Sequence, residues 1–447
     1  MNRGLVVLLL SLSVVFVRAQ QIDEELLLSL QQSYQETPQQ KALRNAVCAN
    51  DIRKLALNQD NLGEMKTEFT YRVPQKGITD QKQSGRCWLF TGLNVLRAHA
   101  IKEHQLDKFT FSQAYLFFYD QLEKSNLFLQ SVIDTRKLPM DDKKVEFLFK
   151  NPVSDGGTFT GVADLVLKYG LVPSEVMPET FTTNSTSRFV GLLKTQLREY
   201  GMELRKMKGA DQQLVACKNE MLQTVYRMLV MAMGIPPQSF TWNDKEYTPM
   251  TFAAEYGNDE LMHHYVMLMN DPTREYYRMY EIDQDRHVYE GHNWLYLNLP
   301  VEDIKQMAIS SLKDSVAMYF SCDVAKELNS ERGLLDLNNY DYGAIFGTSF
   351  NMDKKDRIAS FASGSSHAMT LVAVKIENDK PVRWMVENSW GEKSGWKGHL
   401  IMTDEWFNEY MFRLVIEDKY LLDSLRPILK TKPIKLPCWD PMFQVEE

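Results

Sequence analysis

The sequence predicts an α+β protein in which helices come first and antiparallel strands follow. Apolar residues recur at helical spacing through most of the chain up to about residue 290, and five short runs of β-type residues come after it. With 447 residues, the chain is long enough for two or three average domains or for one elaborated domain.

Composition and charge exclude one class of function. The residues are 44% hydrophobic and 25% charged, and the formal net charge is −8. No block of basic residues stands out, so the charge pattern of a nucleic-acid-binding protein is missing. We therefore expect no nucleic-acid partner.

The N-terminus has the pattern of an export signal. Arg3 precedes the apolar segment LVVLLLSLSVVFV at 5–17, and Val17 and Ala19 occupy positions −3 and −1 of a cleavage site. This segment is shorter than the ~20 apolar residues that cross a bilayer comfortably. We interpret 1–19 as a signal peptide, with an uncleaved anchor as the alternative. The protein is then exported, periplasmic or secreted, and keeps no stable membrane anchor after signal removal.

Export makes the cysteines informative. An odd number of five at irregular spacing is not a disulfide scaffold, and no CxxC pair suggests zinc. At least one thiol is therefore free, and we expect neither a metal ion nor a cofactor. The pattern leaves open whether a disulfide joins any of Cys48, Cys217, Cys322 and Cys438.

The first elements place Cys87 at the start of a helix. Residues 20–75 are polar and helix-leaning and end in the loop YRVPQKGITDQ. A helix is predicted from Cys87 because one apolar stripe follows it, formed by Leu89, Leu93, Leu96 and Ala100. In the first turn of a helix the N–H groups lack intrahelical acceptors and the dipole is positive.

Capping and turn residues along the chain mark the bounds of the next elements. Ser112 is a predicted N-cap, NPVSDGGTF at 151–159 is a predicted loop, and Gly170 ends the helix after it. Residues 187–233 are almost wholly helical in pattern, and we interpret about 175–290 as a mostly helical insertion. A helix at 301–313 then separates the first two β-type runs, which lie at 293–300, 316–324, 366–376, 382–390 and 398–403.

Cys87, within DQKQSGRCWLF, is a candidate nucleophile. A thiol attacks carbonyls well only as a thiolate, and an isolated cysteine with a pKa of about 8.5 is mostly protonated at neutral pH. A helix N-terminus and a neighbouring imidazolium lower that pKa by several units. The site therefore needs a histidine, a residue that orients it, and donors for the oxyanion.

His367 is the best of the eight candidate histidines. His99 and His104 lie on the same helix as the cysteine and cannot reach back to it, and His263 and His264 lie in the insertion. His367 opens an apolar strand after the loop ASGSS, which would leave one ring edge exposed at a cleft.

Two amides complete the set. Asn388, within ENSWGEKSG, is suited to fix the imidazole tautomer, and Trp390 would shield that hydrogen bond from water. Gln81 precedes Cys87 by six residues, a distance that suits an amide donor aimed at the same oxyanion as the Cys87 N–H.

Three stretches together resemble the papain-type cysteine peptidases: QKQSGRCWLF, SHAMTLVAV and VENSWG. They resemble in particular the bleomycin hydrolase and aminopeptidase C branch, in which Ser-Gly-Arg precedes the cysteine. His367 and Asn388 follow Cys87 by 280 and 301 residues, against about 130–150 in papain-type enzymes, and the insertion suits the excess. Further stretches extend the resemblance over about 45–442, namely SQAYLFFYDQLEK, DGG, CDVAKEL, MTDEWFNEY and LPCWDPM.

The resemblance implies a papain-like two-lobe fold, with a helical lobe, an antiparallel β-barrel-like lobe and a large helical insertion. The expected division is a signal peptide at 1–19, an N-terminal segment and helical catalytic lobe at 20–174, the insertion at 175–290, a β-rich catalytic lobe at 291–437, and a C-terminal arm toward the active-site cleft at 438–447.

The resemblance also implies roles for the matching residues. Cys87 would be the nucleophile and His367 the base that then protonates the leaving amine. Asn388 would orient His367, and Gln81 would be an oxyanion donor.

Gly156 and Gly157 match the loop with which papain-like enzymes pair with the substrate backbone. Glycine suits this role because a close approach tolerates no side chain. A plain tight turn is the alternative.

The chain departs from the branch in three places. It has DGGTF where DGGQW is usual, so contacts near Thr158 differ. Members of the branch are mostly cytosolic, whereas this chain has an export signal. In the branch, the C-terminal carboxylate meets the α-ammonium of the substrate and restricts cutting to N-terminal residues. The tail there resembles Gly-Ala-Leu-Ala, but here it is MFQVEE. Its acids would still hold an ammonium group, with a merely disordered polar tail as the alternative.

The sequence therefore predicts a cysteine aminopeptidase of broad specificity that acts on peptides through an acyl-enzyme thioester. An endopeptidase with an open cleft and a catalytically silent peptide-binding protein are the alternatives. The resemblance implies a homohexamer that encloses its active sites.

Overall fold

The structure is a computed structural model that describes residues 21–440 and Met442. The described chain divides into two units. The small unit contains residues 21–57 and Asp341–Thr348, and the large unit contains residues 58–340 and the described residues from 349 on. All the candidate site residues lie in the large unit, which contains most of the two ranges expected for the lobes and the whole range expected for the insertion.

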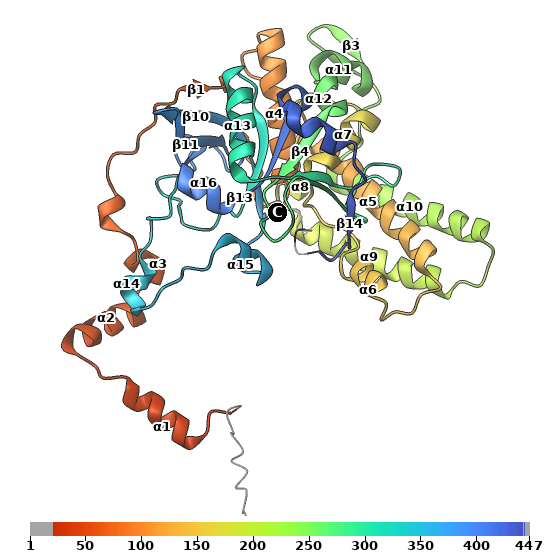
Figure 1. Cartoon of the computed structure of the whole chain (residues 1–447). Helices are drawn as coiled ribbons and strands as arrows, with labels where there is room; N and C mark the ends of the chain where they lie inside the picture. The colour runs from red at the N-terminus through yellow and green to blue at the C-terminus, as the bar shows by residue number, and fades with distance from the viewer. Residues whose placement is uncertain (1–20, 441, 443–447) are drawn as a thin grey trace, which may run out of the picture. The chain divides into compact units, whose positions relative to one another are not determined.

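The small unit is helical, as the polar, helix-leaning pattern predicted. Asp23 and Thr37 cap its first two helices through their side chains. The expected signal peptide lies outside the described residues and stays a prediction. Within the described part of the chain, no helix is long and apolar enough to cross a bilayer. The helices are α1 (Glu24–Ser33), α2 (Pro38–Ala49), α3 (Ile52–Leu55) and α14 (Tyr342–Phe346) (Figure 1).

The helical part of the large unit confirms the predicted starts and stops. The helix α4 (Cys87–His104) begins at the candidate nucleophile. Ser112 Oγ accepts the Tyr115 N–H at the start of α5 (Gln113–Thr135). Gly170, with φ +75°, ends α7 (Phe159–Tyr169). The other helices are α6 (Lys143–Lys150), α8 (Phe181–Asn184), α9 (Ser187–Lys206), α10 (Asp211–Met233), α11 (Pro249–Tyr256), α12 (Asp259–His263), α15 (Lys354–Ala359), α16 (Asp404–Tyr410) and α17 (Arg426–Leu429), with 3-10 turns at Gln59–Asn61, Asp418–Tyr420 and Asp423–Leu425.

A large mixed sheet forms the second part of this unit. Its order is β14-β5-β6-β4-β13-β7-β10-β11-β12-β9-β8, and β1 pairs with β10. A separate hairpin is formed by β2 (Phe240–Trp242) and β3 (Lys245–Tyr247). The strands of the sheet are β1 (Tyr71–Arg72), β4 (Tyr265–Met269), β5 (Arg278–Ile282), β6 (Leu295–Asn298), β7 (Met318–Cys322), β8 (Leu328–Asn329), β9 (Leu334–Leu335), β10 (His367–Glu377), β11 (Lys380–Glu387), β12 (His399–Thr403), β13 (Met411–Glu417) and β14 (Ile434–Leu436).

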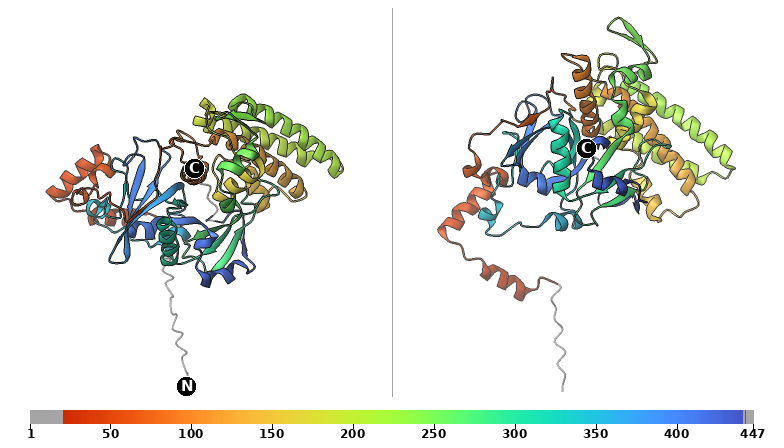
Figure 2. Two further views of the ribbon diagram at one scale, coloured as in Figure 1. Left: turned by 90° about the horizontal axis from the view of Figure 1, so that it is seen from above. Right: turned by 45° about the horizontal axis from the view of Figure 1, so that its top comes forward.

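The five predicted β-type runs all contain strands, and α13 (Val301–Lys313) lies at the predicted position. The range 175–290 differs in part from the expected insertion, because β4 and β5 within it belong to the sheet. The β4 run, YVMLM, is apolar at almost every position, so no periodicity separates a buried strand from a buried helix there. Figures 1 and 2 show the long helices α5, α9 and α10 gathered at one side of the sheet.

The seam between α4 and β10 joins the helical part to the sheet. One hydrophobic cluster contains Cys87, Trp88 and the apolar faces of the helices, and a second surrounds the sheet and α13. Across the seam, Arg97 of α4 forms an ion pair with Glu387 at the end of β11, and both side chains are buried. Burial raises the pKa of Glu387 although Arg97 opposes the shift. The pair therefore fixes the relative placement of two elements rather than adding much net stability.

We expect Arg97→Met to lower the free energy of unfolding by about 3–5 kcal/mol, because it leaves the Glu387 carboxylate buried without a counter-ion. The double variant Arg97→Met/Glu387→Gln removes both charges and should lose less. Equilibrium urea unfolding followed by circular dichroism measures both. A single variant as stable as the double variant would contradict this account of the seam.

Candidate active site

Cys87 is the first residue of α4 and is fully buried. The residue before it, Arg86, is also buried and anchors this end of the helix. Its guanidinium donates to Glu179 at 2.7 Å, to the carbonyl of Thr183 at 2.6 Å and to Ser84 Oγ at 3.1 Å. The sulfur therefore sits at the positive end of the helix dipole on a firmly held turn.

The strand β10 brings the predicted histidine to the same place. It begins at His367, and the backbone N–H of Ala368 donates to Cys87 Sγ at 3.4 Å. His367 is 2% exposed and is the residue directly before Ala368. Two segments 280 residues apart in the sequence therefore meet at the sulfur.

Asn388 follows the last residue of β11 and binds the imidazole. Its Oδ1 lies 2.8 Å from His367 Nε2 and also accepts the Ser389 N–H at 2.8 Å. Because a backbone N–H needs an acceptor, this second bond fixes which amide atom is the oxygen. His367 Nε2 then carries the hydrogen. The Trp390 ring packs against the imidazole, with 4.8 Å between the ring centroids.

Gln81 lies on the loop before α4 and is linked to the same strand end. Its Oε1 accepts from Ser389 Oγ at 2.6 Å, and its Nε2 donates to the Ser84 carbonyl at 2.7 Å. One of the two N–H groups of the amide is therefore used within the loop, and the other remains for a further acceptor. The structure thus brings Gln81 together with Asn388 through Ser389.

The loop that contains Gly156 and Gly157 lies beside the helix of Cys87. Trp88 Nε1 donates to the Asp155 carbonyl at 2.8 Å, and the Gly85 N–H donates to Asp155 Oδ2 at 2.8 Å. Neither Gly156 nor Gly157 has a positive φ, so no left-handed turn requires glycine there. A Cβ at Gly157 would instead overlap the His287 ring and Trp88.

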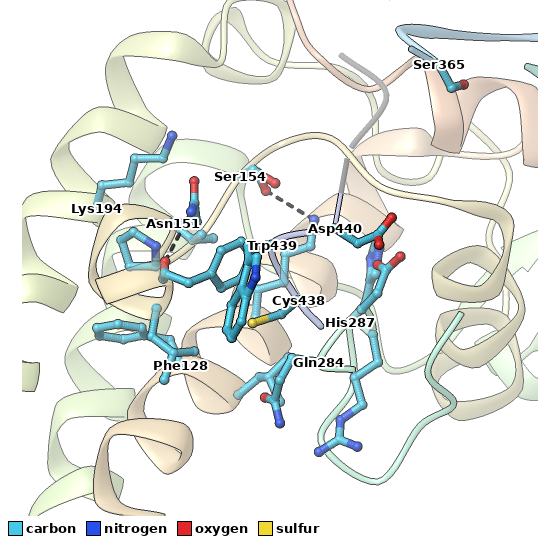
Figure 3. A pocket seen from close by; sticks show the side chains of 18 of the residues that line it. Phe128, Asn151, Ser154, Lys194, Gln284, His287, Ser365, Cys438, Trp439 and Asp440 are labelled. Carbon is cyan, nitrogen blue, oxygen red and sulfur yellow. Dashed lines mark hydrogen bonds between the residues drawn. The ribbon is translucent and has the colours of Figure 1, made fainter. Parts of the chain in front are cut away.

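A cavity of about 630 Å³ lies on this side of the site (Figure 3). Ser365 and Ser366, which immediately precede His367, line one part of it, and the segment 151–154 lines another. Cys438, Trp439 and Asp440 of the C-terminal segment line a third part, as Figure 3 shows. The C-terminal segment therefore lines the same cavity as the two serines directly before His367.

Sequence reasoning missed the polar groups that hold this arrangement. Asp155 links the loop before α4 to the loop that contains Gly156 and Gly157, which we call the glycine loop. Asp120, Lys124 and His287 form a cluster of charged and polar side chains next to it. The spacing of Asp120 and Lys124, at i and i+4, was visible in the sequence. Such pairs are common on exposed helix faces, so the spacing alone does not reveal a buried pair.

The described residues contain no group of three or more His, Cys, Asp or Glu side chains that could hold a metal ion. All five cysteines are free thiols, so the pairing left open by the sequence is absent.

The chain is similar to known peptidases over almost its whole length. The model of the peptidase C1-like family matches residues 21–443. Human bleomycin hydrolase is 37% identical over 450 residues, which cover 95% of this chain and 99% of that protein. Aminopeptidase G of Lactobacillus delbrueckii subsp. lactis is also 37% identical, with 91% of this chain and 96% of that protein covered.

A solved structure shows the same fold. The crystal structure of PepW from Lactobacillus rhamnosis HN001 has a TM-score of 0.91 and 35% sequence identity, and the match covers 96% of this chain and 100% of that one. The match extends over almost the whole of both chains, so the expected papain-like α+β fold is confirmed. The chain is a cysteine peptidase and belongs to the peptidase C1-like family.

Proposed function

We propose that the protein hydrolyses peptide bonds through a thioester on Cys87 and removes N-terminal residues from peptides. The observation that carries the proposal is the hydrogen bond from Ala368 N–H to Cys87 Sγ, because His367 is the residue before Ala368 and the sulfur lies at a helix N-terminus. The Asn388 bond to His367 Nε2 leaves Nδ1 as the nitrogen that exchanges a proton with the thiol.

The reaction then follows from these positions. His367 takes the thiol proton of Cys87, and the thiolate attacks the substrate carbonyl carbon. The free N–H of Gln81 stabilises the resulting oxyanion. The C–N bond breaks as His367 protonates the leaving amine, which gives the thioester. Water attacks the thioester with His367 as base, and the released acid leaves Cys87 as a thiol again.

The names of the relatives and the C-terminal segment support action at the N-terminus. Asp440 borders the cavity that also includes Ser366, next to His367. The segment is anchored there, because Asp440 pairs with Arg274 at 2.5 Å and the Met442 carbonyl accepts from Arg413 at 3.1 Å. Five residues follow Met442 and end in two glutamates. Carboxylate side chains suit the α-ammonium of a peptide.

We expect iodoacetamide at pH 6 to alkylate Cys87 stoichiometrically, and His367→Ala to abolish this. An unactivated thiol with a pKa of about 8.5 is almost entirely protonated at pH 6, whereas a thiolate paired with imidazolium is not. Peptide mass spectrometry identifies the alkylated residue, and the exposed thiol of Cys48 is the internal control. Equal modification of both thiols would argue for a catalytically silent protein.

We expect aminoacyl-coumarin substrates to be hydrolysed and their N-acetylated forms to be hydrolysed at least about tenfold less well, since a lost charge-assisted contact of ~1.4 kcal/mol changes a rate constant tenfold. Removal of 443–447 should narrow this difference. Cys87→Ala gives the background. Equal turnover of free and blocked substrates by the full-length enzyme would instead favour an endopeptidase with an open cleft.

We also propose that the protein is a homo-oligomer, with a hexamer as the state that the family resemblance implies. Phe181 and Met231 are 89% and 88% exposed, and Leu192 lines a shallow groove together with Met231. Thr180 Oγ1 donates to the Ala232 carbonyl, so Phe181 lies near this groove. Exposed apolar side chains that gather in this way are typical of subunit contacts.

We expect Met231→Glu to lower the assembly state measured by size-exclusion chromatography with light scattering, because it places a charge in an apolar contact. Met250→Glu, at a half-exposed methionine on α11, is the matched control. A monomeric wild-type protein would disprove the oligomer.

A further inference from the structure

Three consecutive main-chain carbonyls of the glycine loop, Ser154–Gly157, accept hydrogen bonds from side chains of α4 and α5. The Ser154 carbonyl accepts from Gln121 Nε2 at 2.8 Å and from Lys124 Nζ at 3.1 Å. The Asp155 carbonyl accepts from Trp88 Nε1, as described above. The Gly156 carbonyl accepts from Lys124 Nζ at 2.6 Å. Lys124 is therefore the one described side chain that binds two carbonyls of this loop.

Lys124 is itself held in place by a buried carboxylate. Its Nζ lies 2.9 Å from Asp120 Oδ2, one turn earlier on α5, and its own side chain is only 11% exposed. Burial acts to raise the pKa of Asp120, but Lys124 and His287 together lower it, so the carboxylate is ionised. A buried lysine with a fixed counter-ion offers its remaining protons in fixed directions, which is what two carbonyl acceptors require.

His287 completes the cluster from the other side. Its Nδ1 lies 2.6 Å from Asp120 Oδ1. Burial, together with the charge of Lys124, lowers the pKa of His287, so the ring is neutral and Nδ1 donates its hydrogen to the carboxylate. The ring fills a slot beside Gly157 and Gly161, where any Cβ would overlap it, and meets the Trp88 ring edge-on at 4.7 Å.

The cluster thus reaches the main chain of the loop through the two hydrogen bonds that Lys124 donates. From the described contacts, we infer that Lys124, fixed by Asp120 and His287, is a positioning residue that holds the main chain of Ser154–Gly157 in the conformation that binds the substrate. This inference rests on the proposed function and on the role that the family resemblance implies for this loop, which is to pair with the substrate backbone. Lys124 contacts the loop through main-chain carbonyls, and none of the three cluster residues takes part in the proposed reaction, so their loss should affect substrate binding more than the chemical step.

The test separates substrate binding from the chemical step. In Lys124→Met/Asp120→Asn both buried charges are removed, so no uncompensated ion remains, and an asparagine oxygen can still accept from His287. We expect KM for the hydrolysed coumarin substrate to rise about tenfold, equivalent to ~1.4 kcal/mol of binding, with kcat within about twofold of wild type. The single variant Lys124→Arg keeps a charged donor, so its KM should be much closer to that of wild type than to that of the double variant.

Controls distinguish this role from a purely structural one. Lys150→Met makes the same change at an exposed lysine of α6 and should leave KM and kcat unchanged. Titration of active sites with a thiol reagent corrects for any unfolded fraction. Unchanged KM in the double variant, or a fall in kcat alone, would overturn the inference while leaving the proposed function intact. Wild-type turnover no greater than that of Cys87→Ala would overturn both.

Discussion

The contact between the first turn of α4 and the first residues of β10 is the constraint on which the site depends. The sulfur of Cys87 belongs to the helical cluster, whereas His367 begins β10 and Asn388 directly follows β11. Their distance is therefore set by how the two parts pack. The buried Arg97–Glu387 pair crosses the same seam one residue before Asn388. An ion pair of this kind specifies register at a desolvation cost that apolar packing would avoid.

The polar groups around the site form a layered arrangement. Asn388 and Trp390 act on the imidazole directly, Gln81 and Ser389 link the loop before α4 to the strand end, and Asp155 links that loop to the glycine loop. Each bond is between a side chain and a neighbouring main chain or side chain of a different segment. Because such bonds are strongest when buried and fully paired, they hold several loops in one geometry at once.

Local patterns in the sequence predicted the ends of several helices, but they did not predict contacts between residues that are far apart in the chain. The start of α4 at Cys87, the cap at Ser112, the stop at Gly170 and the bounds of α13 followed from capping chemistry and period. The strand β4 was hidden inside an expected helical range because a uniformly apolar run has no diagnostic period. His287 meets Asp120 across 167 residues, and no spacing rule reports such a pair.

The buried guanidinium of Arg86 has a consequence for how this chain can change over time. Its partners, Glu179 and the Thr183 carbonyl, lie at the entrance to the helical insertion, while its own backbone precedes the reactive sulfur. The Cys87 loop and the start of the insertion therefore constrain each other in evolution. A homologue that lost Glu179 and Thr183 would leave the Arg86 guanidinium buried without its acceptors, one residue from Cys87, so we expect changes in the two segments to occur together.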